Sequence, residues 1–380
     1  MLKVRQVITS TDLRHYINLP YQLYSSFRNF VPPLKQDERR FHDEHYNFSL
    51  KGCEVVRYIA LDEDKIVGRV MGIIPLEYNR LHQLQTARFF QLDCENDFQI
   101  FSILIQSIEK WAFSKGMKKL IGPFGFSDKD PQGLQIEGLE NLPVIAAPYN
   151  PDYLPVLTEQ YGFKKEIDCV SYKMIIPEIF PEYYIRIYRR LLQRTNFKLI
   201  EFKHRNELKP FIKPVFQLIN LAYQKIYGFM PMHEPEMDYL ASQYLPVLNP
   251  KYVKCITNTS GQLLAFVIAM PHMSEGLKKA KGNLFPFGFM HIINSMRRTR
   301  QLNLLLGAVH PDWQGLGLTT LLGVKLFESA RDRFEFIDSH LILETNLRMR
   351  AEVERLGARV YKRFRSEEHT SELQSRFGIS

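Results

Sequence analysis

The stretch Val309-His-Pro-Asp-Trp-Gln-Gly-Leu-Gly-Leu-Thr319 joins an apolar run, 302–308, that predicts a strand to an apolar-periodic segment, 320–331, that predicts a helix. The first N–H groups of a helix have no partner inside it, and the helix dipole adds positive charge there. Glycines let the backbone approach an anion without a Cβ in the way. We therefore expect this turn to bind a phosphate group.

Three phosphate-binding turns compete for this stretch. The kinase-type P-loop requires a Lys-Ser/Thr pair after its glycine, and none stands here. The dinucleotide fingerprint G-x-G-x-x-G is matched by Gly315 and Gly317, but its third position is Thr320. The turn also lies too late in the chain for a complete nucleotide-binding half to follow.

The third candidate, [QR]-x-x-G-x-[GA] after a strand ending in Val-x-Pro, fits better. Gln314, Gly317 and the Val309-x-Pro311 lead-in match it, and Thr319 in the sixth position departs from it. The stretch thus resembles the pyrophosphate turn of the GNAT acyltransferases. An ordinary glycine-rich connection between a strand and a helix is the structural alternative.

The residues that follow extend this resemblance. Segment 340–345 predicts a strand, Asn346 is a good N-cap for a helix over 347–356, and Gly357 is a good C-terminal residue for that helix. Segment 358–364 predicts a last strand. This order is similar to that of GNAT proteins, which implies acyl transfer from acyl-coenzyme A to an amine. The tyrosine that often protonates the leaving thiolate in that family is replaced by Val353.

The resemblance also implies site residues. The backbone N–H groups of Ala308 and Val309 would bind the thioester carbonyl and the pantetheine arm, and Asn346 would contact the pantetheine or only cap its helix. Gln314 would contact the pyrophosphate. The pyrophosphate would be held by the N–H groups of Gly315, Leu316, Gly317, Leu318 and Thr319.

The reaction also requires a general base that accepts the ammonium proton. Glu344 and His310 are the main candidates, although each could be only a strand-end or turn residue. Tyr227, His233 and His272 are weaker candidates.

Composition sets broader limits. A chain of 380 residues has room for two domains. It contains no apolar run of about 18 residues, the length needed to span a membrane. Its start lacks the apolar core of a signal peptide, and its four cysteines are widely spaced, so we expect a cytoplasmic protein.

Charge and motif spacing limit the ligands. The formal net charge of +9 suits anionic partners such as coenzyme A or acidic lipid headgroups. No nucleic-acid-binding motif is present, and no His, Cys, Asp or Glu residues have metal-ligand spacing. We therefore expect no nucleic acid and no metal.

The order strand, helix, hairpin, strand, helix, strand occurs twice. This predicts an α/β fold with mixed sheets, in which two GNAT-like acyl-CoA N-acyltransferase units lie in tandem. The first unit would span 1–176 and the second 196–365, joined by 177–195. In the first unit the acidic run Cys94-Glu-Asn-Asp97 stands where the phosphate turn should be, so we expect that unit not to bind coenzyme A.

Further motifs carry a closer resemblance. The motifs are Glu109-Lys-Trp-Ala112, Lys115-Gly-Met117, Gly122-Pro123, Glu137-Gly138, Tyr149-Asn150 and Tyr161-Gly-Phe163. With them, most of the chain resembles the acyltransferase family that includes the bacterial ceramide synthases, which implies N-acylation of a sphingoid long-chain base.

Segment 271–301 is an insertion relative to a plain GNAT unit. Apolar residues at Phe289, Ile292, Ile293 and Met296 have helical spacing, and Arg297 and Arg298 follow. Such a helix suits the surface of an anionic membrane, which predicts peripheral contact at the inner face through 282–300. A helical hairpin packed on the protein's own core is the alternative.

The last residues have an unusual origin. Arg365-Ser-Glu-Glu-His-Thr-Ser-Glu-Leu-Gln-Ser375 is encoded by one reading frame of a common sequencing-adapter oligonucleotide. We therefore expect 366–380 to be an artefact of sequencing and to be disordered.

The sequence as a whole predicts an acyl-CoA-dependent N-acyltransferase that acts by direct attack of an amine, with a lipid-like sphingoid amine as acceptor. Two alternatives remain open. One is a soluble N-acetyltransferase for a small amine or a peptide N-terminus. The other is a non-catalytic acyl-CoA-binding protein, which the valine at position 353 would allow.

Overall fold

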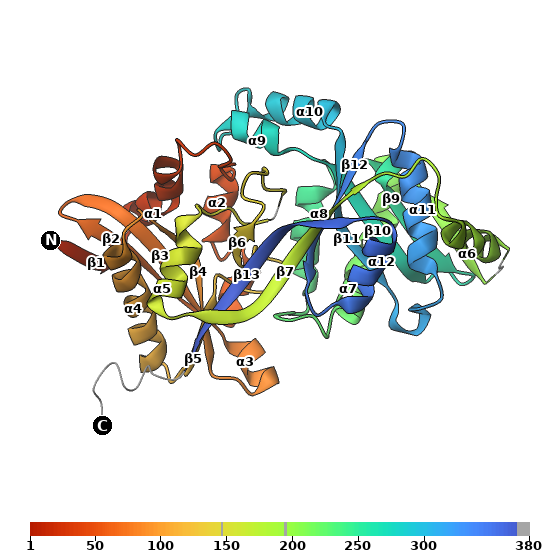
Figure 1. The fold of residues 1–380 in the computed structure, drawn as a ribbon. Coiled ribbons are helices and arrows are strands. Elements are labelled where there is room, and N and C mark those ends of the chain that lie inside the picture. Colours follow the sequence, from red (N-terminus) through yellow and green to blue (C-terminus); the bar gives the residue numbers. More distant parts are fainter. Residues whose placement is uncertain (146, 194–195, 371–380) are drawn as a thin grey trace.

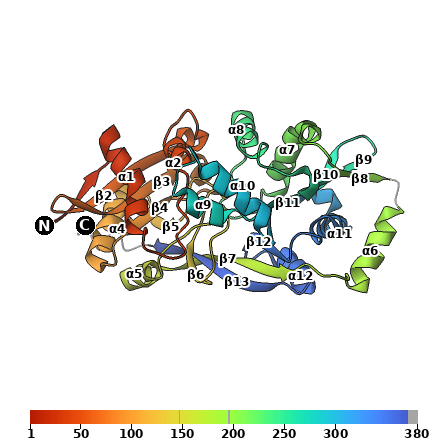
Figure 2. The same cartoon turned by 90° about the horizontal axis from the view of Figure 1, so that it is seen from above.

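The computed structural model describes residues 1–145, 147–193 and 196–370. Thirteen strands of this part form one mixed sheet, with helices on both faces (Figures 1 and 2). The strands of the first unit are β1 (Leu2–Gln6), β2 (Cys53–Asp62), β3 (Lys65–Pro75), β4 (Thr86–Cys94), β5 (Lys119–Gly122), β6 (Leu134–Glu137) and β7 (Lys164–Ile175). Those of the second are β8 (Phe197–Glu201), β9 (Val253–Asn258), β10 (Leu263–Pro271), β11 (Gln301–Val309), β12 (Phe336–Leu343) and β13 (Arg359–Thr370).

The helices alternate with these strands along the chain. The first unit contains α1 (Ser10–Leu23), α2 (Lys35–Phe41), α3 (Leu76–His82), α4 (Phe98–Ser114) and α5 (Tyr153–Tyr161), and α6 (Glu182–Leu192) follows in the connecting segment. The second contains α7 (Ile212–Ala222), α8 (Glu234–Tyr244), α9 (Ser274–Ala280), α10 (Gly288–Arg298), α11 (Leu318–Ala330) and α12 (Leu347–Arg355). Short 3₁₀ helices cover Phe48–Gly52, Arg205–Phe211, Pro250–Tyr252 and Pro311–Trp313.

The two units exchange their last strands. The sheet order is β1-β2-β3-β4-β5-β13-β7-β12-β11-β10-β9-β8, so β13 of the second unit lies beside β5 of the first. Likewise β7 of the first unit lies beside β12 of the second, and the two exchanged strands cross the middle of the molecule (Figure 1). The α/β class and the tandem arrangement are therefore confirmed. The boundaries at 176 and 196 remain predictions. They divide the chain into two units, but one continuous sheet runs through both units.

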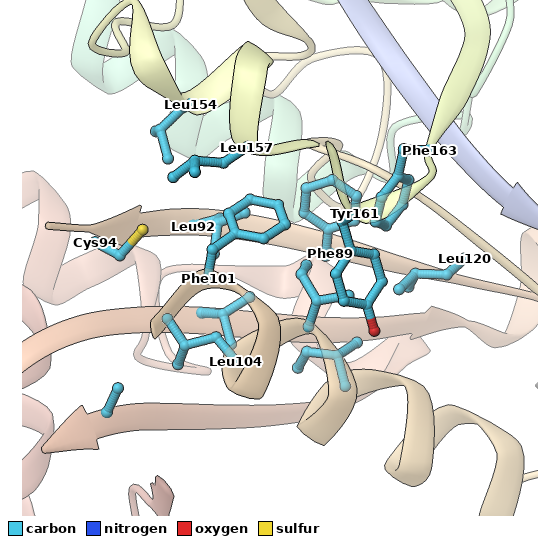
Figure 3. Close-up of a cluster of buried hydrophobic side chains, with 14 of the residues drawn as sticks. Phe89, Leu92, Cys94, Phe101, Leu104, Leu120, Leu154, Leu157, Tyr161 and Phe163 are labelled. Carbon is cyan, nitrogen blue, oxygen red and sulfur yellow. The ribbon is translucent and has the colours of Figure 1, made fainter. Parts of the chain in front are cut away.

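The core of the first unit forms between α4 and strands β2 to β4. Phe101, Leu104, Ile105 and Ile108, expected on one face of that helix, are all fully buried. Figure 3 shows Phe101 and Leu104 beside Phe89 of β4 and the α5 side chains Leu154, Leu157 and Tyr161. The spacing of the apolar residues on α4 thus explains which face packs on the sheet.

In the second unit, helices cover both faces of the sheet. Val267 of β10 packs in the cluster that contains residues of α11 and α12, whereas its neighbour Phe266 packs with residues of α7. Successive side chains of a strand point to opposite faces, so α7 lies on the face opposite α11 and α12. No helix of the described residues is long and apolar enough to cross a bilayer.

Two expected elements differ from the structure. Strand β12 begins at Phe336 rather than at residue 340. The insertion holds two helices, α9 and α10, rather than one. In addition, α7 is preceded by a 3₁₀ helix, Arg205–Phe211, because Pro210 and Pro214 disrupt a continuous α-helix.

The expected disorder from residue 366 is wrong for 366–370. Strand β13 continues to Thr370 and pairs with both β5 and β7 there, since these strands offer unpaired backbone on either side. Residues 371–380 lie outside the described residues. Because 366–370 carry the adapter-encoded sequence, no functional role is assigned to their side chains.

Candidate acyl-transfer site

Strands β11 and β12 are parallel but separate after three paired positions. The pairs run from Gln301 and Phe336 to Asn303 and Asp338. Each strand then bulges, β11 at Leu305 and β12 at Ser339–His340. A bulge bends its strand away from the regular course, so the two bulges open a gap between the strands, here called the opening.

The β11 side of the opening presents backbone groups. The N–H of His310 donates to the carbonyl of Leu264 at 2.7 Å, which fixes the hydrogen-bond alternation between β10 and β11. By that alternation the N–H of Ala308 bonds to β10, whereas the N–H groups of Gly307 and Val309 point into the opening. The expected contact of the Ala308 N–H with a thioester is therefore wrong, and that of Val309 stays a prediction.

The turn after β11 is shaped by two glycines with positive φ, Gly315 at 77° and Gly317 at 90°. A Cβ on Gly317 would lie 2.8 Å from Cγ2 of Ile187 in α6, so only glycine fits there. The backbone N–H groups of 315–319 have no acceptor among the described residues. The amide of Gln314 instead donates to the carbonyl of Val309 at 3.3 Å. The turn thus has the free donors that an anion site requires, and α11 begins directly behind it.

In the first unit, the backbone groups at the corresponding place are already hydrogen-bonded within the protein. The N–H of Glu95 donates to the carbonyl of Val67, just as the N–H of His310 donates to the carbonyl of Leu264 in the second unit. The residues that precede these two donors, Cys94 and Val309, therefore occupy corresponding positions. The carbonyl of Cys94 accepts the hydroxyl of Tyr153 at 2.7 Å. The carboxylate of Asp97 accepts the N–H of Gln99 at 2.6 Å and that of Ile100 at 3.2 Å, so the first turn of α4 is capped by its own side chain.

Glu344 does not face the opening. Its carboxylate accepts the ammonium of Lys165 at 2.7 Å and the N–H of Asp168 at 3.1 Å, and both partners belong to β7. Strand β7 lies on the side of β12 opposite β11. The ion pair directs the carboxylate of Glu344 away from the opening, and this geometry argues against Glu344 as the general base.

The side chains of His310 and Asn346 each accept a hydrogen bond from a nearby backbone N–H group. The Nδ1 of His310 accepts the N–H of Asp312 at 3.3 Å and so caps the short 3₁₀ helix of the turn. This engagement argues against His310 as a base. The side-chain oxygen of Asn346 accepts the N–H of Met349 at 3.2 Å, which confirms its N-cap role in α12. Its contact with pantetheine stays a prediction.

A buried polar cluster, not expected from the sequence, lies where the strands begin to separate. Asp338 is fully buried, and its carboxylate accepts the N–H of His340 at 2.7 Å and the hydroxyl of Tyr361. The amide of Asn303 lies 3.3 Å from Nδ1 of His272. We call these five residues the junction cluster. One signal was available in the sequence, since the polar pair Asp338-Ser339 interrupts an otherwise apolar strand.

A loop of the first unit closes the base of the opening. Its carbonyls at Leu142, Pro143 and Ile145 accept hydrogen bonds from the second unit. The donors are the Lys362 ammonium at 2.6 Å, the Ser274 hydroxyl at 2.6 Å and Nε2 of His340 at 3.1 Å. The first unit therefore contributes backbone, rather than a cofactor turn, to the site.

Burial shifts the titration of the ionisable groups here. It lowers the pKa of His272 to about 4, and it also lowers the pKa of His340. Burial likewise lowers the pKa of Lys362 to about 8. Both histidines are therefore neutral at neutral pH.

Comparison with known proteins agrees with this geometry. No family model matches the chain. It is 27% identical over 375 residues to Protein YghO of Escherichia coli (strain K12), across 95% of this chain and 94% of that protein. It is 24% identical over 376 residues to a bacterial ceramide synthase of Caulobacter vibrioides (strain NA1000 / CB15N), across 96% of each chain.

Solved structures show the same architecture. A tandem GNAT protein from the clavulanic acid biosynthesis pathway superposes with a TM-score of 0.55 at 14% identity, over 97% of this chain and 98% of that one. The chain has the tandem GNAT fold. A probable N-acyltransferase from Enterococcus faecalis V583 gives a TM-score of 0.54 at 10% identity, over 99% of this chain and 74% of that one. These similarities, with that to the ceramide synthase, confirm the predicted family resemblance and support an acyltransferase.

The insertion at 271–301 lies over the junction between the units (Figures 1 and 2). Its α9 side is attached to the first unit, because the carbonyl of Gly282 accepts the N–H of Lys35 at 2.8 Å and Lys278 donates to the carbonyl of Arg28. Ile292 of α10 is buried in a cluster that Leu305 of the β11 bulge contacts. One side of the insertion thus packs on the protein, as the alternative expected, and the membrane contact stays a prediction.

The other side of the insertion exposes large apolar side chains. Phe285 is 73% exposed, Phe287 64% and Met290 54%. The remaining members of this surface, here called the α10 surface, are Phe289 and Ile293. Arg297 and Arg298 stand in the last turn of the helix.

Proposed function

We propose that the chain is an acyl-CoA-dependent N-acyltransferase that acts on a lipid-like, sphingoid amine. One observation supports acyl-coenzyme A as the co-substrate. The five free N–H groups of 315–319 stand beside the opening, whereas the equivalent N–H groups of the first unit are capped by a side chain. The sequence similarity to a bacterial ceramide synthase supports a sphingoid amine as the acceptor.

The geometry fits transfer in a single step. With its pyrophosphate at 315–319, acyl-coenzyme A would extend along β11, where the N–H groups of Gly307 and Val309 are available for the pantetheine arm and the thioester. The amine nitrogen attacks the thioester carbonyl, the C–N bond forms and the C–S bond breaks. Positioning of both substrates in the opening would supply much of the rate. The side chain of Val353 has no proton to donate, so in this proposal the leaving thiolate takes its proton from water.

The α10 surface supports a lipid acceptor. Exposed aromatic and aliphatic side chains next to arginines match an anionic membrane surface, from which a long-chain amine could enter the opening below the insertion. Each basic residue near such a surface contributes about 1 kcal/mol. Peripheral membrane contact through 282–300 thus remains part of the proposal.

An assay of the purified protein tests the function. The protein is incubated with palmitoyl-CoA or acetyl-CoA and with sphinganine or a small primary amine, and the amide and free coenzyme A are measured by mass spectrometry. We expect an N-acyl sphinganine from the long-chain donor. Acetylation of the small amine alone would replace the proposal with a small-molecule acetyltransferase. Binding of acyl-CoA without any amide, in a single-turnover experiment, would indicate the non-catalytic alternative.

A further inference from the structure

We propose that His340 accepts the proton of the acceptor amine, and that the loop 142–145 of the first unit orients its ring. This inference rests on the proposed N-acyltransferase function and names the base that Glu344 does not provide. It is carried by the position of His340, by the hydrogen bonds of its ring and by the cluster around it.

His340 stands where β12 turns away from β11. It belongs to the β12 bulge, and its φ of 59° is left-handed, a conformation that non-glycine residues adopt at an energetic cost. Its ring bonds to Ile145, and Ile145 packs in the cluster that Leu305 of the β11 bulge also contacts. The loop 142–145 and the cluster it packs against thus connect the two bulges, and we infer that His340 stands at the base of the opening.

The hydrogen bonds of the ring determine which nitrogen can act as a base. Nε2 lies 3.1 Å from the carbonyl of Ile145, and a carbonyl can only accept, so Nε2 carries the proton. Nδ1 therefore holds the free electron pair, and it has no partner among the described residues.

His272 differs in this respect. The amide oxygen of Asn303 accepts from Gln301 at 2.9 Å, so its amide nitrogen donates to Nδ1 of His272. The electron pair of that ring is therefore already engaged. Of the two histidines, only His340 is oriented as a proton acceptor.

The charged groups around His340 come from three strands. Asp338 of β12 favours the protonated ring, and Lys362 of β13 opposes it. Lys173 of β7 is the strand partner of Asp338, and like Lys362 it opposes protonation of the nearby His272. Burial outweighs Asp338 and lowers the pKa of His340, so the ring is neutral and able to accept a proton at neutral pH.

The step balances without a further reactant. An ammonium acceptor transfers one proton to Nδ1 of His340 as its nitrogen forms the C–N bond. As the C–S bond breaks, the nitrogen loses its second proton to water, and the thiolate that leaves takes a proton from water, so these two transfers cancel. His340 then releases its proton to solvent, so the net products are the amide, free coenzyme A and one proton.

Two substitutions separate this role from a structural one. His340→Gln keeps an N–H that can reach the Ile145 carbonyl, and His340→Asn suits the left-handed backbone. Neither side chain titrates near neutral pH. His15→Gln is the matched control, because it removes an exposed histidine from α1 of the first unit, outside the acyl-transfer site.

We expect both His340 variants to lower kcat about 100-fold or more, as loss of a general base does. The KM for acyl-CoA should not change. The wild-type rate should fall at acidic pH as the ring is protonated. The rates of the variants should not show this acidic fall. His15→Gln should keep the kcat and the pH profile of the wild type.

The outcomes distinguish the two proposals. An active wild type with an unaltered kcat and pH profile in His340→Gln would overturn the role of His340 alone. A wild type that forms no amide from any donor or amine would overturn the proposed function, and the role of His340 with it.

Discussion

Gly315 offers a test of the cofactor turn at the scale of one residue. A Cβ at this position meets no atom within 4 Å, so Gly315→Val introduces no clash, but a positive φ costs a non-glycine residue roughly 1–2 kcal/mol. We expect the turn to relax away from its present shape and the affinity for coenzyme A to fall about tenfold. Calorimetric titration with coenzyme A measures this. Gly323→Ala, in open space within α11, is the control and should bind normally. Equal affinities for all three proteins would exclude the turn as the phosphate site.

Lys362 should influence stability through pH. Burial lowers its pKa in the folded protein to about 8, below the value of 10.5 in an unfolded chain. Between these values the unfolded chain binds more protons, so the free energy of unfolding should rise as the pH increases from 8 toward 10. Urea denaturation at several pH values tests this. In Lys362→Met the rise should be smaller, and an identical pH dependence in both proteins would contradict the assignment.

At the scale of elements, the α10 surface can be separated from the catalytic site. Phe287→Asp with Phe289→Asp removes two apolar side chains from this surface and adds negative charge. We expect binding to phosphatidylglycerol vesicles to weaken about tenfold or more, because each buried aromatic side chain contributes roughly 1.5–3 kcal/mol. Vesicle sedimentation at low and high salt provides the measurement.

A control for this experiment is available elsewhere on the surface. Ile179 is 86% exposed and lies in the connecting segment, so Ile179→Asp makes a similar change away from the insertion. It should leave vesicle binding intact. If the double variant and Ile179→Asp bind alike, or if the wild type does not bind anionic vesicles, the membrane contact is disproved.

The elements also show what could be predicted from the sequence. The glycines of the turn and the cap at Asn346 depend on neighbouring residues, so local patterns were sufficient to find them. The direction of Glu344 depends on Lys165 and Asp168, which lie in the other unit. His340 was assigned to the start of a strand because a bulge breaks the alternation on which strand prediction relies.

At the scale of the molecule, the exchange of β7 and β13 joins the two units into one sheet. We expect a single cooperative unfolding transition in calorimetry, with equal calorimetric and van't Hoff enthalpies. A fragment of residues 1–193 should not fold alone, because β5 and β7 then both lack the strand between them. Two separated transitions, or a stable fragment with native circular dichroism, would show that the units are independent.

The exchange has a consequence for synthesis. Tyr172 of β7 pairs with Val360 of β13, so β7, which is made early, waits for the last described strand before its sheet is complete. During translation the first half leaves the ribosome with an open sheet edge, which is a hazard for aggregation. The rate of folding should therefore depend on the arrival of the C-terminal strand, and the nascent first half is a natural client for a chaperone.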